Sequence, residues 1–224
     1  MAKLQGINAI LFDVDGTLFS SEDILYDVYH TALKKFQLKH GRPETLPGLP
    51  AIMQQIGQPV KKIFQNLVPE LTEEERDEIS NQILIDLVNR IEAGEGIRYD
   101  GVFETIQSLA DSNIRIFAAS NGRKKYVQAI LKSLKIIDYF EAVPTIDNVK
   151  IMNKNELVAC ILDDFGLKPK ECIIVGDRAT DRDAGILNEV SFVATSYGHH
   201  SSLDEHNGAV ATIDSFSELL ELVL

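Results

Sequence analysis

Short runs of apolar, partly β-branched residues recur along this chain and restrict the folds that it can adopt. The runs are Ile7–Phe12, Ile114–Ala119, Cys172–Val175 and Ser191–Ala194, with a weaker one at Phe140–Val143. Such runs are typical of strands buried on both faces of a sheet. Between them, apolar residues recur at helical spacing, in the sets Val127, Ile130, Leu131, Leu134 and Val158, Ile161, Leu162, Phe165. This alternation predicts an α/β fold, a Rossmann-like parallel sheet with helices on both faces.

The segment from Phe19 to Gly96 differs from the rest, because it carries helical patterns and no predicted strand. Its two apolar stripes are Leu25, Val28, Tyr29, Ala32, Leu33, Phe36 and Ile79, Ile83, Leu84, Leu87, Val88, Ile91. Thr72 and Glu75 have the spacing of a capping box at the start of the second helix. We therefore predict an α/β core formed by residues 1–18 and 97–224, with an inserted α-helical cap domain at residues 19–96.

Charge and composition exclude several classes of partner. The 224 residues are 45% hydrophobic, which is enough to bury a full core, and the formal net charge of −12 leaves no basic footprint for nucleic acid or an anionic membrane. The first apolar run is broken by Asp13 and is too short for a signal peptide or a membrane span. Cys160 and Cys172 lack the spacing of a metal site or a disulfide framework. We expect a cytoplasmic monomer or homodimer with no nucleic-acid or membrane partner.

The stretch ILFDVDGTL places two carboxylates, Asp13 and Asp15, directly after the first predicted strand. An Asp-Gly hairpin is a competing interpretation, but the residues after Gly16 follow helical spacing. In an open parallel sheet, ligands bind beyond the carboxyl ends of the strands. Two carboxylates this close repel each other unless a cation lies nearby, and hard oxygen ligands suit Mg²⁺ in the company of phosphate. We therefore predict Mg²⁺ as the cofactor.

Two further predicted strands also end in polar residues. IIVGDRATD places Asp177 after its strand, with Asp181 close behind, and IFAASNG ends in Ser120, Asn121 and Gly122. A hydroxyl followed by backbone N–H groups at the start of a helix forms a ready anion pocket. Because the carboxyl ends of parallel strands meet at one edge, we expect these groups to converge on a single crevice.

Taken in order, DVDGT, SNG, a later lysine and GDRATD, with a helical block after the first motif, resemble the haloacid dehalogenase superfamily. The chain looks nearest to the phosphoglycolate phosphatase-like branch, which carries a helical cap, and the resemblance covers nearly the whole chain. It implies a Mg²⁺-dependent phosphatase that hydrolyses a small phosphate monoester, a phosphorylated metabolite, through an aspartyl-phosphate intermediate.

The resemblance also implies roles for individual residues. Asp13 would be the nucleophile that takes the phosphoryl group, since a carboxylate can attack phosphorus directly, and Asp15 would be the general acid and base. Mg²⁺ would be held by the carboxylates of Asp13 and Asp177 and by the backbone carbonyl of Asp15, with Asp181 in support. The groups that would bind the substrate phosphate are Thr17, Ser120, Asn121 and Gly122.

The family also supplies a catalytic lysine, which the resemblance assigns to the stretch DNVKIMNKNELVACIL. Counting back from Cys172 to the preceding predicted helix favours Lys154 over Lys150. Arg123, just after the SNG motif, is a candidate for contact with the substrate. The histidines of GHHSSLDEHNG are interpreted as part of a surface loop, because Mg²⁺ disfavours imidazole ligands.

Two other functions fit parts of this pattern. A phosphomutase of the same superfamily, similar to β-phosphoglucomutase, would carry the same motifs and would differ in the lifetime of its aspartyl phosphate. A non-enzymatic phosphate-binding or signalling protein, such as a receiver domain, would store phosphate on Asp13, but it needs neither the helical insertion nor Asp15 as an acid. The insertion contains no readable substrate code, so phosphoglycolate, sugar phosphates, nucleotides and pyrophosphate remain open.

Overall fold

A parallel sheet of five strands forms the centre of the protein in the computed structural model, which describes residues 3–42, 46–146, 151–199 and 203–224. The strand order is β4-β1-β5-β6-β7. The strands are β1 (Ala9–Phe12), β4 (Arg115–Ala118), β5 (Cys172–Gly176), β6 (Ser191–Thr195) and β7 (Ala211–Ile213). The four clearest predicted strands are therefore present, and β1 lies between β4 and β5.

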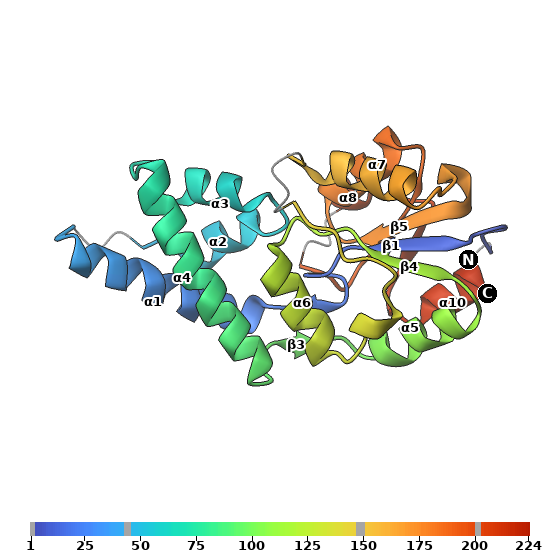
Figure 1. Cartoon of the computed structure of the whole chain (residues 1–224), viewed down its shortest axis with the longest axis horizontal. Coiled ribbons are helices and arrows are strands. Elements are labelled where there is room, and N and C mark those ends of the chain that lie inside the picture. Colours follow the sequence, from blue (N-terminus) through green and yellow to red (C-terminus); the bar gives the residue numbers. More distant parts are fainter. Residues whose placement is uncertain (1–2, 43–45, 147–150, 200–202) are drawn as a thin grey trace.

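Alternating residues of the strands pack on opposite faces of the sheet, as a pleated strand requires. In β1, Ile10 and Phe12 belong to one buried cluster, whereas Ala9 and Leu11 belong to another. Figure 1 shows α5, α6 and α10 on one face of the sheet and α7 and α8 on the other. The predicted Rossmann-like α/β fold is confirmed.

The helices that cover the sheet follow its strands along the chain. They are α5 (Val102–Asp111), α6 (Lys124–Ser133), α7 (Lys154–Asp164), α8 (Ala179–Leu187), α9 (Leu203–His206) and α10 (Glu218–Val223), with short 3₁₀ turns at Ile137–Tyr139 and Pro169–Glu171. The stripes predicted around Val127 and Val158 fall on α6 and α7.

The weak run Phe140–Val143 does not form a strand. The segment makes only isolated bridges beside β4, between Phe117 and Ala142 and between Ser120 and Thr145. Pro144 has no N–H to donate, so a continuous ladder cannot extend through it.

Four helices lie in the segment predicted as helical, residues 19–96, among its described residues: α1 (Glu22–Lys39), α2 (Leu49–Gln55), α3 (Val60–Leu67) and α4 (Glu73–Glu92). The predicted capping box starts α4, where the Glu75 N–H donates to the Thr72 hydroxyl and the Thr72 N–H donates to the Glu75 carboxylate. The expectation of no strand here is wrong at Phe19–Ser20, where β2 pairs with β3 (Ile97–Arg98). This antiparallel pair brings together the two ends of the helical segment, which we call the insertion (residues 19–96).

The insertion lies beyond the carboxyl ends of the sheet strands, with α4 beside α6 (Figure 1). Its apolar residues join the buried cluster on the α6 side of the sheet, so the two parts pack together. The division into a core of residues 1–18 and 97–224 and a cap of residues 19–96 remains a prediction. Among the described residues, we find no helix that is both long and apolar enough to cross a membrane.

Candidate active site

Three neighbouring strands deliver the predicted site residues to one edge of the sheet. Asp13 follows β1, Ser120 lies just beyond β4, and Asp177 follows β5. The Asp13 N–H donates to the carbonyl of Val175 at 2.9 Å, which fixes the strand end. Because β1 is paired on both sides, by β4 and β5, its carboxyl end lies at the centre of this edge.

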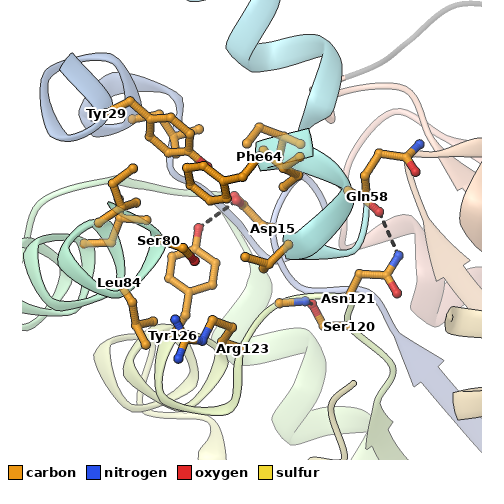
Figure 2. Close-up of a pocket in the computed structure, with 18 of the residues that line it drawn as sticks. Asp15, Tyr29, Gln58, Phe64, Ser80, Leu84, Ser120, Asn121, Arg123 and Tyr126 are labelled. Atoms are coloured by element: carbon orange, nitrogen blue, oxygen red, sulfur yellow. Dashed lines mark hydrogen bonds between the residues drawn. The ribbon is translucent and has the colours of Figure 1, made fainter. Parts of the chain in front are cut away.

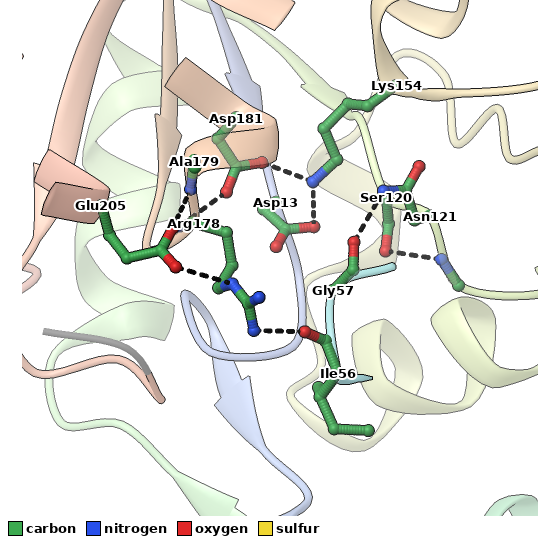
Figure 3. A network of polar contacts seen from close by, with 11 residues as sticks. Asp13, Ile56, Gly57, Ser120, Asn121, Lys154, Arg178, Ala179, Asp181 and Glu205 are labelled. Atoms are coloured by element: carbon green, nitrogen blue, oxygen red, sulfur yellow. Dashed lines mark hydrogen bonds and ion pairs between the residues drawn. The ribbon is translucent and has the colours of Figure 1, made fainter. Parts of the chain in front are cut away.

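Lys154 joins this edge from the first turn of α7. Its side chain is 2% exposed, and its Nζ lies 2.8 Å from Oδ1 of Asp13 while also contacting Asp181 (Figure 3). Burial by itself opposes the ammonium charge, yet the carboxylates of Asp13 and Asp181 raise the pKa of Lys154 above its usual range. The side chain is therefore a buried cation next to the predicted nucleophile. Lys150, the alternative, lies outside the described residues.

The carboxylates of Asp13, Asp177 and Asp181 form a buried cluster in which one ligand oxygen from each lies within 4.8 Å of the others. Burial, followed by the charges of Asp13 and Asp181, raises the pKa of Asp177 well above its ordinary value. A divalent cation would offset this repulsion. Asp181 already uses one oxygen on Lys154 and the other on the Arg178 N–H at 3.0 Å. Asp13 and Asp177 are therefore the better placed metal ligands.

The main chain packs tightly around this acidic cluster. Gly16 has a φ of +93°, and a Cβ there would lie 2.6 Å from the Asp177 carboxylate oxygens. A Cβ on Gly176 would lie 2.3 Å from the Asp181 carboxyl. Only glycine permits this approach, which brings the DVDGT loop against Asp177. The donor set of hard oxygens and the surplus of negative charge fit Mg²⁺.

Arg178 offsets only part of this surplus, because its guanidinium makes its contacts with groups outside the cluster. It donates to the carbonyl of Ile56 in the insertion and lies 3.7 Å from Glu205, which also accepts from the Ala179 N–H (Figure 3). Arg178 therefore links α8 to the insertion, while Glu205 caps the start of α8.

The predicted phosphate-binding groups lie around Asp13, although one of them is turned away. The Thr17 hydroxyl is buried and has no hydrogen-bond partner among the described residues. The Ser120 Oγ accepts from the Gly122 N–H at 3.2 Å. The Asn121 side-chain amide instead donates to the carbonyl of Gly57 at 2.7 Å, in the insertion. The phosphate-binding roles of Thr17 and Ser120 remain predictions, and the Asn121 amide NH₂ holds the insertion.

Asp15 lies in the same cavity as Asp13 and Ser120, but it has its own partners. Its carboxylate accepts from the Ser21 N–H at 3.0 Å, from the Ser21 hydroxyl at 2.6 Å and from the Tyr126 hydroxyl at 2.6 Å (Figure 2). Burial and the Asp15 charge raise the pKa of Tyr126 well above its ordinary value, so the phenol remains a donor. The carboxylate is therefore held at the junction of the core and the insertion.

Sequence reasoning missed the side chains that surround Asp15. Tyr126 lay within an unremarkable helical stripe. His199 was interpreted as part of a surface loop, but its side chain is 2% exposed, its Nε2 lies 2.7 Å from the Ser20 Oγ, and it is 3.7 Å from Asp15. No local sequence pattern predicts these contacts, because each of them joins residues far apart in the chain. Arg123 donates to Asn81 of α4 at 2.8 Å and lines the cavity.

Together, the fold and the site define a class of α/β enzymes built around a buried aspartate at the carboxyl end of β1. Residues 10–195 match the family model for haloacid dehalogenase-like hydrolases, and the chain belongs to this family. It is 27% identical over 222 residues to a phosphoglycolate phosphatase of Nitrosococcus oceani, covering 96% of this chain and 95% of the relative. The resemblance predicted from the motifs and the phosphatase-type hydrolase class are both confirmed.

Two further comparisons agree with this assignment. The chain is 24% identical over 196 residues to the pyrophosphatase PpaX of Halalkalibacterium halodurans, covering 82% of this chain and 83% of the relative. A crystal structure titled as a predicted phosphoglycolate phosphatase of Haemophilus somnus superposes with a TM-score of 0.85 at 22% identity, covering 97% of this chain and 98% of that chain. The latter shows a shared fold.

We predict that Asp177→Asn raises the melting temperature of the metal-free protein and abolishes its stabilisation by Mg²⁺. The raised pKa of Asp177 means that the folded state holds this proton more tightly than the unfolded state, so metal-free stability falls as pH rises above about 4. The asparagine amide does not ionise, so Asp177→Asn removes this loss of stability. Wild-type protein should gain about 2.7 kcal/mol at a Mg²⁺ concentration of about 100 Kd.

Calorimetry with and without Mg²⁺ measures both effects. Asp183→Asn is the matched control, because Asp183 belongs to the same motif but its side chain is 53% exposed and paired with Arg182. A Mg²⁺ shift that survives in Asp177→Asn would contradict the metal assignment.

We also predict that Lys154→Met lowers turnover by at least roughly tenfold, because it removes a cation from the developing phosphoryl charge. Steady-state kinetics measures this, with circular dichroism to verify folding. Lys168→Met is the matched control, since Lys168 is 77% exposed and paired with Glu171. Equal turnover in the two variants would contradict a catalytic role for Lys154.

Proposed function

We propose that this protein is a Mg²⁺-dependent phosphatase that hydrolyses a phosphate monoester through an aspartyl phosphate on Asp13. The observation that carries this function is the buried contact between Lys154 Nζ and Asp13 Oδ1, 2.8 Å apart, at the edge where Ser120 and Asp177 also lie. The buried ammonium group holds the Asp13 carboxylate in a fixed orientation, which a nucleophile requires.

The two chemical steps can be written with the residues of this chain. An Asp13 oxygen attacks phosphorus, the phosphorus–oxygen bond to the ester breaks, and Asp15 gives its proton to the leaving oxygen. Asp15 then removes a proton from water, whose oxygen attacks phosphorus, and the bond to Asp13 breaks to release inorganic phosphate. Phosphate is the product, and both carboxylates return to their initial states.

Charge stabilisation accompanies both steps. Lys154 offers its ammonium group to the phosphoryl oxygens, and Thr17 and Ser120 offer hydroxyl donors. When bound by Asp13, Asp177 and the Asp15 carbonyl, Mg²⁺ supplies positive charge that offsets the repulsion between the anionic ester and the carboxylates. Asp181 positions Lys154 through their buried contact.

We further propose that residues 19–96 act as a cap that closes over this site. Several side chains of the core contact the insertion. Among them, Arg178 donates to Ile56 O, Asn121 to Gly57 O, and Arg123 to Asn81. These contacts support a closed arrangement that excludes bulk water from the phosphoryl step.

Asp13→Asn should lower hydrolysis of 4-nitrophenyl phosphate by roughly a hundredfold or more, because an amide is a poor nucleophile. Release of inorganic phosphate in the presence and absence of Mg²⁺ measures the loss, and chelation should abolish the wild-type rate. Asp183→Asn again serves as the control. A folded Asp13→Asn protein that retains most of its turnover would overturn the function, and isomerised ester without phosphate release would indicate a mutase.

Asp15→Asn should impair alkyl phosphates more than aryl phosphates. An alkoxide is a poorer leaving group than a phenolate, so it depends more on the proton from Asp15, whose catalysis contributes about 10²–10⁴-fold. The ratio of wild-type to variant kcat is compared between benzyl and 4-nitrophenyl phosphate. Equal ratios would remove Asp15 from the role of acid.

A further inference from the structure

A cavity extends from the predicted nucleophile into the insertion. Asp13, Asp15 and Ser120 line one end of it, and residues of α1, α3 and α4 line the other (Figure 2). A phosphoryl group held at Asp13 would therefore have its ester group in the insertion end. The chemistry of that end decides which ester group fits.

The insertion end of the cavity is apolar. Tyr29 and Phe64 stack there with ring centroids 5.8 Å apart and planes 8° from parallel. Leu84 of α4 faces them across the cavity (Figure 2). The other apolar side chains of this end are Leu25, Ile56, Val60, Ile63, Ile83 and Leu87. Such a lining favours an apolar group over one that keeps its hydration shell.

The polar groups among the described lining residues do not provide a site for a second anion. Arg123 is the sole cation among them, and its guanidinium donates to Asn81. Tyr126 donates to Asp15, and the polar side chains Gln58 and Ser80, both in the insertion, are neutral. Lys61 and Lys62, the lysines of α3, do not line the cavity, and Lys61 pairs with Glu73 at 2.9 Å.

The apolar walls make an anionic ester group still less favourable. A second negative charge on the substrate would lose its hydration shell against these side chains. Both phosphoglycolate and pyrophosphate carry such a second charge. A neutral alcohol carries none and loses little hydration on entering.

We propose that the natural substrate is a phosphate monoester of an uncharged, mainly apolar alcohol. This substrate class rests on the proposed phosphatase function and adds the nature of the leaving group. The alcohol would occupy the space between the Tyr29 and Phe64 rings and Leu84, with its oxygen toward Asp15.

A pair of esters with similar leaving groups tests this class. Benzyl phosphate and 4-carboxybenzyl phosphate differ by one remote carboxylate, which changes the charge of the alcohol but scarcely its basicity. We expect kcat/KM for benzyl phosphate to be higher by roughly tenfold or more, because the carboxylate would lose its hydration shell against the apolar insertion end of the cavity. Phosphoglycolate and pyrophosphate should be poorer substrates than benzyl phosphate.

A variant pair locates the effect in the cavity. Leu84→Lys places a cation on the half-buried lining of α4 and should reduce or reverse the preference for benzyl phosphate. The adjacent Ile85, 53% exposed and outside the cavity lining, provides the control Ile85→Lys, which should keep the wild-type preference. The comparison of esters with the wild-type protein stands even where a variant fails to fold.

The possible outcomes distinguish a failure of the proposed substrate class from a failure of the proposed phosphatase function. Equal or faster hydrolysis of the carboxylated ester, of phosphoglycolate or of pyrophosphate would overturn the apolar class and leave the phosphatase intact. If folded Leu84→Lys keeps the wild-type ester preference, the selectivity arises elsewhere, and the claim that this cavity binds the alcohol is wrong. No Mg²⁺-dependent hydrolysis of any of these compounds would overturn the phosphatase itself.

Discussion

A single buried ammonium group ties together three segments that lie far apart in the chain. Lys154 on α7 contacts Asp13 after β1 and Asp181 on α8, and its side chain is 2% exposed. Removing ions from water costs several kcal/mol each, so this arrangement persists only because the partners satisfy one another. One ammonium does not neutralise the three carboxylates of the cluster, because Arg178 is engaged with Ile56 and Glu205. The remaining negative charge is what favours a divalent cation.

The insertion meets this charged centre with a very different surface. Its contacts with the core are polar where Asn121 reaches Gly57 and where Arg178 reaches Ile56, but the cavity behind them is apolar. Under the proposed function, the core would supply charge for phosphoryl chemistry, while the insertion would supply an environment that excludes water. Asp15 lies at the boundary, held by Ser21 and Tyr126, and this is where a leaving oxygen would need its proton.

Much of the fold was predictable because local patterns and tertiary packing agree. The strands of the sheet centre are apolar on both faces, and the Thr72–Glu75 capping box lies where its spacing indicated. The misses have physical causes. The edge strand β7 is only three residues long and buries only Ile213, so it gives a weak signal, and Pro144 stops the run Phe140–Val143. The pair β2–β3 is two residues long on each side and depends on chain ends that converge only in the folded protein.

By itself, the sequence determined the α/β class, the family motifs and the group of carboxylates at the strand ends, because strand periodicity and short motif spacing are local properties. It also favoured Lys154, which the structure places beside Asp13. Only the tertiary structure decided that Asn121 turns to Gly57, that His199 is buried beside Ser20, and that Tyr126 holds Asp15. The apolar cavity is likewise a tertiary property, since its walls come from separate helices. Contacts between distant segments depend on how the helices pack against the sheet. The local sequence around a residue does not specify that packing.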